Sequence, residues 1–179
     1  MSQEAHNPPT DVNGTLSASA TVHINSATAP PQPIPLRMTP LFREPLSNHT
    51  VEVKLAAVRA AIEAGADVNQ LDDDPTGHNE GRPLDACLNL PHMAGSADVT
   101  TNLPVIKLLL EHGADPRLRA RSIFWPPIAV ARRYADQAGL SKKGMAFWDG
   151  VLMLFEDAIE RLKEKEAREM EEATKQTGS

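Results

Sequence analysis

One tripeptide occurs twice in this chain, each time directly after an apolar helical pattern, and it restricts the fold more than any other feature. Gly-Ala-Asp stands at residues 65–67 and again at 113–115. Glycine just past the last turn of a helix adopts a left-handed conformation at no steric cost. An aspartate two residues later can hydrogen-bond to the backbone of the turn that follows. The chain therefore uses the same device to end two helices, which suggests an internal repeat.

Three segments have the apolar spacing of amphipathic helices, at residues 51–64, 103–112 and 145–162. Thr50 stands where it can cap the first helix and Asn102 where it can cap the second. Aromatic residues make up only 4% of the chain, so we expect a mainly aliphatic core. The residues expected in that core are Leu55, Val58, Ile62, Val105, Ile106, Leu109, Leu110, Phe147, Val151, Leu154, Phe155, Ala158, Ile159 and Leu162.

A second pattern recurs upstream of each of these segments. Proline followed by Leu or Ile stands within MTPLFRE (38–44), GRPLDAC (81–87) and WPPIAVA (125–131). Proline at this place suits the first turn of a helix, where its missing N–H has no intrahelical partner in any case. We therefore expect a short helix to precede each longer one.

With these elements in order, the chain resembles the ankyrin repeat. In that family a Thr-Pro-Leu-His helix, a leucine-rich second helix and a Gly-Ala-Asp loop follow one another. VIKLLLEHGADP (105–116) and AAVRAAIEAGADVN (56–69) are similar to the second helix and its exit loop. The resemblance implies an all-α fold over residues 37–162: a short ankyrin-like solenoid of about three helix pairs with projecting loops.

Several features depart from the ankyrin pattern. The two triplets are 48 residues apart, against a usual period of about 33, so we expect insertions at 72–80 and 91–101. Arg82 and Asp85 replace the Thr and His of the helix opening, and the hydrogen bonds at this helix start should differ accordingly. Pro45 should break the first short helix. Because no third Gly-Ala-Asp follows, a longer helix should end the stack.

The flanking segments have compositions of their own. Residues 1–36 are rich in Ser, Thr, Ala and Pro, and we expect a disordered tail because they cannot bury enough apolar surface. They lack the charged and apolar parts of a secretory signal. With no apolar run of about 18–20 residues and a single cysteine, we expect an intracellular protein of the cytoplasm or nucleus.

Residues 163–179 are predicted to be a charged helical tail that frays at its end. The spacing of opposite charges four residues apart should stabilise the helix. Apolar heptads are missing beyond the third core segment, which disfavours a coiled-coil dimer, and we expect the isolated chain to be monomeric. The expected i,i+4 pairs are Asp157–Arg161, Glu164–Arg168 and Glu171–Lys175.

No residue pattern in the chain indicates catalysis or a cofactor. Cys87 occupies a position that the ankyrin pattern gives to a small buried residue, and Ala131 stands at the matching place downstream, so we interpret it as core rather than as a nucleophile. The acidic loop 72–80 fails the calcium-loop template, which requires Glu at its twelfth position, where Pro83 stands. The six histidines do not cluster. We therefore expect no enzyme, no metal and no cofactor.

Basic residues concentrate between Arg117 and Lys143, within a chain of net charge -6. Alternation in DPRLRARS would point Arg117, Arg119 and Arg121 to one side of an extended loop. Two interpretations stay open: a solvated loop whose arginines pair with acidic neighbours, or an anchor for an acidic protein segment. The acidic chain disfavours nucleic acid as the ligand of this patch. The basic residues are Arg117, Arg119, Arg121, Arg132, Arg133, Lys142 and Lys143.

The ankyrin resemblance implies non-catalytic protein–protein binding through the loop tips and the concave face of the first helices. An acidic loop beside a basic one would give a bipolar surface that fixes a partner's register. The alternative is a subunit of a larger complex, in which Ile123, Phe124 and Trp125 are permanently covered. The candidate partner-binding residues are Gln70, Asp72, Asp73, His78, Asn79, Arg117, Arg119, Arg121, Ser122, Trp125, Arg132 and Arg133.

Overall fold

The computed structural model describes residues 39–72, 81–88, 98–120, 125–136 and 140–177. All of them belong to one compact unit, Pro33–Ser179. The predicted tail 1–36 and the candidate residues Asp73, His78, Asn79, Arg121 and Ser122 lie outside the described residues.

The described part of the chain is helical and contains no β-strand, which confirms an all-α class. None of its helices combines the length and the apolar content that crossing a membrane requires. The elements are α1 (Pro40–Arg43), α2 (Val51–Glu63), α3 (Pro83–Cys87), the 3₁₀ helix η2 (Val99–Asn102), α4 (Leu103–Glu111), α5 (Pro127–Ala135) and α6 (Lys142–Thr177).

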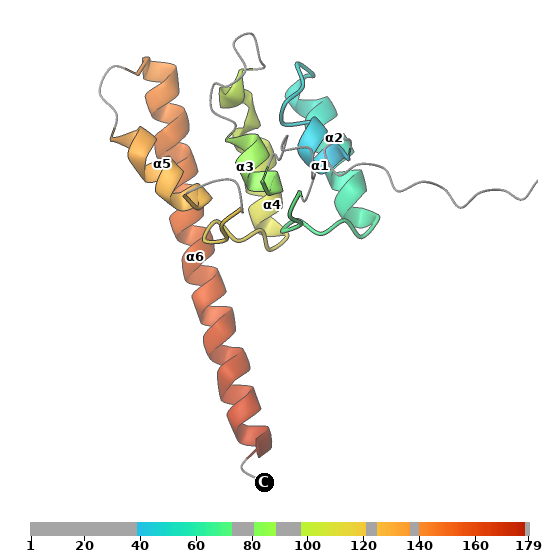
Figure 1. Cartoon of the computed structure of the whole chain (residues 1–179), viewed down its shortest axis with the longest axis vertical. Helices are drawn as coiled ribbons and strands as arrows, with labels where there is room; N and C mark the ends of the chain where they lie inside the picture. Colours follow the sequence, from blue (N-terminus) through green and yellow to red (C-terminus); the bar gives the residue numbers. More distant parts are fainter. Residues whose placement is uncertain (1–38, 73–80, 89–97, 121–124, 137–139, 178–179) are drawn as a thin grey trace, which may run out of the picture. The chain divides into compact units, whose positions relative to one another are not determined.

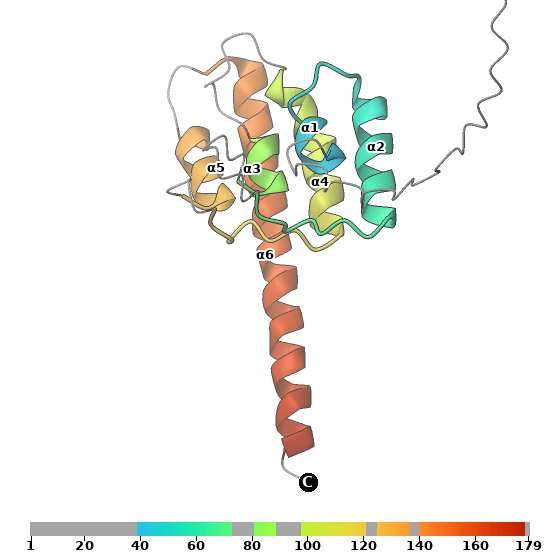
Figure 2. The same cartoon turned by 45° about the vertical axis from the view of Figure 1, so that its right-hand side comes forward.

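The helices pack in three successive pairs. α1 packs against α2, α3 against α4, and α5 against α6; between pairs, α2 packs against α4, α4 against α6, and α1 against α3. Figures 1 and 2 show the three pairs side by side in chain order. Within the described residues, then, α2, α4 and α6 form one row, and the shorter helices α1, α3 and α5 pack along one side of it.

Both Gly-Ala-Asp turns have the conformation that the sequence predicts. Gly65 and Gly113 have φ of 90° and 89°, the left-handed region that glycine enters without strain. The aspartate two residues after each glycine accepts a backbone hydrogen bond from the residue two further on, at 2.8 Å in both turns. In each turn the residue after glycine also closes back on the helix, with Ala66 N donating to Ala61 O and Ala114 N to Leu109 O, both at 3.0 Å.

Two helices begin without the side-chain cap that the sequence predicts. Thr50 and Asn102 stand at the N-cap positions of α2 and α4, but neither side chain accepts a capping hydrogen bond from the first turn. Asn102 is instead buried and bonded to other segments. At α3 the start of the helix is held by a bond in which Arg82 N donates to Asp85 Oδ2 at 2.8 Å.

The core is mainly aliphatic, with buried aromatic side chains in α1 and α6. Of the predicted core residues, nine are buried, and Leu55, Ile62, Leu154, Ile159 and Leu162 are half-buried. The sequence pattern missed Trp148, which is 4% exposed and stacks on Tyr134 with ring centroids 4.9 Å apart. The buried predicted residues are Val58, Val105, Ile106, Leu109, Leu110, Phe147, Val151, Phe155 and Ala158.

The first and last elements differ most in length. α1 has only four residues and ends at Arg43, before Pro45, as the proline predicts. α6 runs unbroken for 36 residues, so the boundary placed at 162/163 falls inside one helix. Beyond Leu162 the described side chains are exposed. All three predicted i,i+4 ion pairs are present on this helix, at Asp157–Arg161, Glu164–Arg168 and Glu171–Lys175.

Candidate functional site

The two Gly-Ala-Asp turns are tied to each other by one side chain. Asn69, in the first turn, donates from Nδ2 to Gly113 O at 2.9 Å and accepts at Oδ1 from Asp115 N at 2.8 Å. A side-chain amide is suited to this, because it carries a donor and an acceptor side by side. These two hydrogen bonds therefore hold the two turns side by side.

A second tie comes from the start of α3. Arg82 donates from Nη1 to Asn69 O and from Nε to Arg119 O, the latter at 3.3 Å. Its guanidinium thus joins the backbone that follows both turns. A third bond, from Ile128 N to Pro116 O at 3.1 Å, joins the second turn to α5. In the sequence Arg82 is marked only by its departure from a pattern, whereas in the structure it links the two turns.

Arg117 forms ion pairs with two carboxylates of the same chain. Its Nη2 lies 2.9 Å from Asp115 Oδ2 and 2.5 Å from Glu166 Oε1 of α6. The hydrogen bonds to Asp115 and then Glu166 raise the pKa of Arg117 further above its ordinary range, and Arg117 lowers the pKa of Glu166 in return. This residue therefore joins the second turn to α6, and a partner would have to compete with two carboxylates for it.

Two more members of the basic set are paired with acidic neighbours. Arg132 Nη2 lies 3.3 Å from Glu156 Oε1 of α6, and Lys143 pairs with Asp98. The hydrogen bond from Lys143, together with that from Thr100, lowers the pKa of Asp98 to about 2. For these residues and Arg117 the structure agrees with the interpretation in which basic side chains pair with acidic neighbours.

Trp125 and Arg133 form a different arrangement at α5. The guanidinium carbon of Arg133 lies 4.9 Å from the centroid of the Trp125 ring, a cation–π geometry. Trp125 is 42% exposed, and Arg133 is exposed as well. Both residues are candidates from the sequence, but no helical spacing connects them, because Trp125 lies before Pro126, the extended N-cap residue of α5.

Gln70 and Asp72, the described candidates at the start of the acidic loop, are less exposed than predicted. Asp72 is buried, and its backbone N donates to Gly81 O at 2.8 Å, which closes the base of the loop. Gln70 is half-buried. Asp72 is therefore not presented to a partner, and the predicted acidic side of a bipolar surface cannot rest on it.

Two buried acidic groups stand close together on α3. Asp85 is 7% exposed, and burial raises its pKa to about 6, although the bond from Arg82 N opposes that change. Cys87 is a free, fully buried thiol, and burial raises its pKa far above the ordinary range. A thiol that is both inaccessible and protonated is not a nucleophile, in agreement with its interpretation as a core residue.

A buried lysine was missed entirely by the sequence analysis. Lys54 of α2 is 1% exposed, and its Nζ donates to Asn102 Oδ1 at 2.9 Å and to Thr101 Oγ1 at 3.3 Å, with Pro45 O at 3.5 Å. Burial lowers its pKa. Its position four residues before buried Val58, on the same helix face, is the signal that could have marked it.

Asn102 completes this polar cluster. Its Nδ2 donates to Pro45 O at 2.9 Å and to Cys87 O at 3.1 Å. With Lys54 on its oxygen, one amide thus connects the loop after α1, helix α2 and the end of α3. All of its partners lie within the core, so the cluster holds the helix pairs together and is closed to ligands.

One histidine has an oriented ring. His49 Nδ1 lies 2.7 Å from Glu44 Oε2, and Arg43 Nη2 lies 2.7 Å from the other oxygen. Burial alone would raise the pKa of Glu44, but the hydrogen bonds with His49 and Arg43 lower it below its usual value. Among the described residues no group of three or more His, Cys, Asp or Glu side chains is arranged to hold a metal ion.

Comparison with known proteins adds no assignment. The chain matches no protein-family model, no curated protein and no solved structure. Any statement about its function therefore rests on the arrangement of its own residues.

Proposed function

We propose that this chain is a non-catalytic protein-binding module, built as a short and irregular ankyrin-like stack. The observation that carries the proposal is the pair of identical helix-ending turns, held side by side by Asn69. Two turns with the same conformation, each following the second helix of a pair, are what a repeated unit predicts. Stacked units of this kind offer extended surfaces to partners.

The packing of the helices supports the same proposal. The second helices α2, α4 and α6 pack in a row, and each contacts its neighbour. Neighbouring units in a repeat protein supply each other's core in this way. The short α1 and the long α6 then act as the two irregular end units, one shortened before Pro45 and one extended by its charged half.

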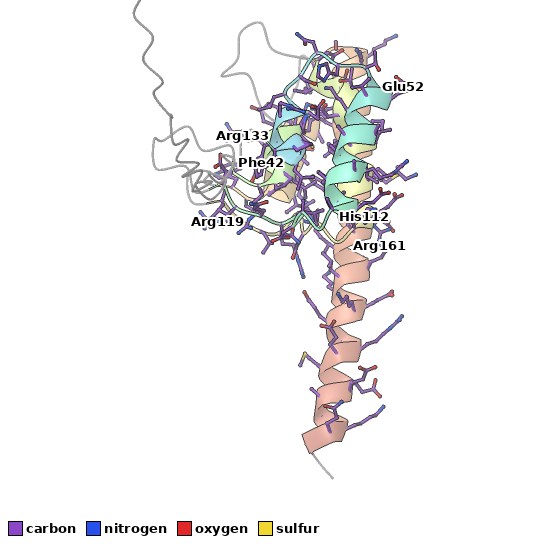
Figure 3. All side chains as sticks on the ribbon, turned by 90° about the vertical axis from the view of Figure 1, so that its right-hand side faces the viewer. Phe42, Glu52, His112, Arg119, Arg133 and Arg161 are labelled. Atoms are coloured by element: carbon purple, nitrogen blue, oxygen red, sulfur yellow. The ribbon has the colours of Figure 1, made fainter. Side chains whose placement is uncertain are left out.

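The surface proposed for binding runs from the tied turns along α5 to Arg133 in its last turn. Figure 3 shows Arg119 and Arg133 on the same side of the molecule as Phe42 of α1, with Glu52, His112 and Arg161 on the opposite side. Arg119 and Arg133 are exposed. A partner on this side would meet backbone held rigid by the bonds of Asn69 and Arg82.

Nucleic acid is disfavoured as the ligand by the contacts of the basic set. Arg117, Arg132 and Lys143 each pair with a carboxylate of the same chain. Affinity for a phosphate backbone depends on the number of phosphates that free cations can neutralise. A subunit role in a larger complex stays the second candidate, because Trp125 is a large exposed aromatic residue of the kind that interfaces cover.

The test is site-specific photo-crosslinking in extract of the source cells. Benzoylphenylalanine would be placed at Arg119, on the proposed binding side, and in a second protein at Lys107, which is exposed on α4. We expect one partner of defined mass to crosslink at position 119 and to compete with unlabelled protein, while position 107 yields none. Equal crosslinking at both positions, or crosslinking that unlabelled protein does not reduce, would contradict the proposal.

A further inference from the structure

Three residues of α5 and its entry form a stripe along the helix surface, here called the α5 stripe: Trp125, Ala129 and Arg133. Ala129 and Arg133 are four residues apart in α5 and lie on one side of the helix. The contact between Trp125 and Arg133 places the indole beside them, just before the helix begins. The small, half-buried side chain of Ala129 separates the two exposed ones. This allows the guanidinium of Arg133 to reach the face of the indole, at 4.9 Å from its centroid.

The charge of Arg133 is not neutralised by the described part of the chain. Its only described interaction is with the Trp125 ring, whereas the adjacent Arg132 pairs with Glu156. Arg133 is exposed and lies in the last turn of α5, where a cation is favoured by the helix dipole. The α5 stripe therefore presents a cation whose position is fixed by an aromatic ring instead of by a carboxylate.

The contact with the ring uses none of the N–H donors of this guanidinium in a conventional hydrogen bond. An arginine carries five such donors, all in the plane of the group. The edge can therefore take a carboxylate with two parallel hydrogen bonds. Trp125, 42% exposed, offers apolar surface immediately beside this edge.

We propose that the α5 stripe binds an acidic peptide segment of the partner protein. A Glu or Asp carboxylate of the segment pairs with the Arg133 guanidinium, and a neighbouring aliphatic side chain packs on the exposed indole of Trp125. This inference rests on the proposed function and names the partner's chemistry. The sequence offers Arg117 as an anchor for an acidic segment, but Asp115 and Glu166 already pair with it. The anchor proposed here is Arg133 of α5.

Charge and geometry favour a peptide over a nucleic acid at this place. A single guanidinium suits a single carboxylate, whereas a phosphate backbone needs a row of cations. The nearest basic neighbour on the helix, Arg132, already has a carboxylate partner.

The experiment measures binding of a fluorescein-labelled peptide, Glu-Asp-Leu-Glu-Asp-Ile-Glu-Asp, to the full chain by fluorescence anisotropy. Its control is the amide peptide Gln-Asn-Leu-Gln-Asn-Ile-Gln-Asn. The variants are Arg133→Gln, Trp125→Ala and, as a matched loss of one positive charge, Arg161→Gln. Arg161 is exposed on α6, on the other side of the molecule in Figure 3. Circular dichroism would establish that each variant keeps its helices.

We expect saturable binding of the acidic peptide and a loss of about tenfold or more in Arg133→Gln, as for a charge-assisted bidentate contact. Trp125→Ala should weaken binding similarly, and Arg161→Gln should leave it unchanged. The inference is overturned by absence of binding, by equal affinity for the amide peptide, by equal loss in Arg161→Gln, or by tighter binding of an oligothymidylate of equal charge. A partner that crosslinks at position 119 but ignores Arg133→Gln removes this inference and leaves the protein-binding module standing.

Discussion

Replacing Asp85 with asparagine should change the pH dependence of stability in a calculable way. The carboxyl is 7% exposed, and burial raises its pKa from 3.8 to about 6 in the folded chain. A carboxyl whose folded pKa is raised favours folding while it is protonated. Its contribution is fully present below the unfolded pKa near 3.8 and is lost as pH rises through about 6. At neutral pH the buried carboxylate therefore lowers the free energy of unfolding.

The magnitude follows from linkage between protonation and folding. A shift of about two units corresponds to about 3 kcal/mol once both states are ionised. At about pH 4.5, where only the unfolded state is largely ionised, the same relation gives about 1 kcal/mol. The introduced amide has nearly the same volume as the carboxyl, and its oxygen could still accept from Arg82 N. The free energy of unfolding of Asp85→Asn, relative to that of wild type, should thus rise by about 2 kcal/mol between about pH 4.5 and about pH 7.5.

The assay is equilibrium unfolding in urea, followed by far-ultraviolet circular dichroism at both pH values. The measured quantity is the change, between the two pH values, in the difference in free energy of unfolding between Asp85→Asn and wild type. Any effect of the new amide on stability that does not depend on pH therefore cancels. Asp149→Asn, at an exposed position of α6, is the control and should show no such change. If the difference between Asp85→Asn and wild type is the same at both pH values, Asp85 is not an ionisable group that burial penalises, and the reasoning fails.

Three further predictions concern the turns and the core. Gly113→Ala should lower the free energy of unfolding by about 1–2 kcal/mol in urea titrations, because φ is 89° while an added Cβ meets no atom within 4 Å; an effect well above that range would reveal a clash. Asn69→Ala should cost about 1–3 kcal/mol for its two lost hydrogen bonds, measured the same way, and an unchanged urea midpoint would show that the tie between the turns is not stabilising. Cys87 should stay unreactive toward Ellman's reagent in the native protein and react at once in urea, since it is fully buried; rapid native labelling would disprove its burial.

The sequence was most informative where a backbone rule acts locally. Gly65 and Gly113 mark helix ends because only glycine enters the left-handed region freely, and both turns formed as predicted. Pro45 limited α1 for an equally local reason. The apolar period likewise located most of the buried side chains of α4 and α6, but it missed Leu108 and Trp148. These features need no knowledge of what lies across the core.

The sequence was least informative where a side chain depends on distant partners. The burial of Lys54 was not predicted, since it requires acceptors 47 and 48 residues away. For Arg117 the sequence left open a partner or an acidic neighbour, and it did not indicate Glu166, 49 residues further on, which holds it. The candidate surface consequently moved from the basic loop to α5. The ankyrin-like stack itself stays a proposal, supported by the turns and by helix packing.

The buried ammonium of Lys54 also bears on the order in which the chain folds. Helix α2 can form early with Lys54 still hydrated, because its helical hydrogen bonds are local. Its acceptors Thr101 and Asn102 come from the next helix pair, so the ammonium can lose water only when the two pairs dock. Stripping a charge of its hydration before the new bonds are complete is costly. We therefore expect the docking of α2 on α4 to be the slow step of folding, and Lys54→Met to accelerate it in stopped-flow refolding.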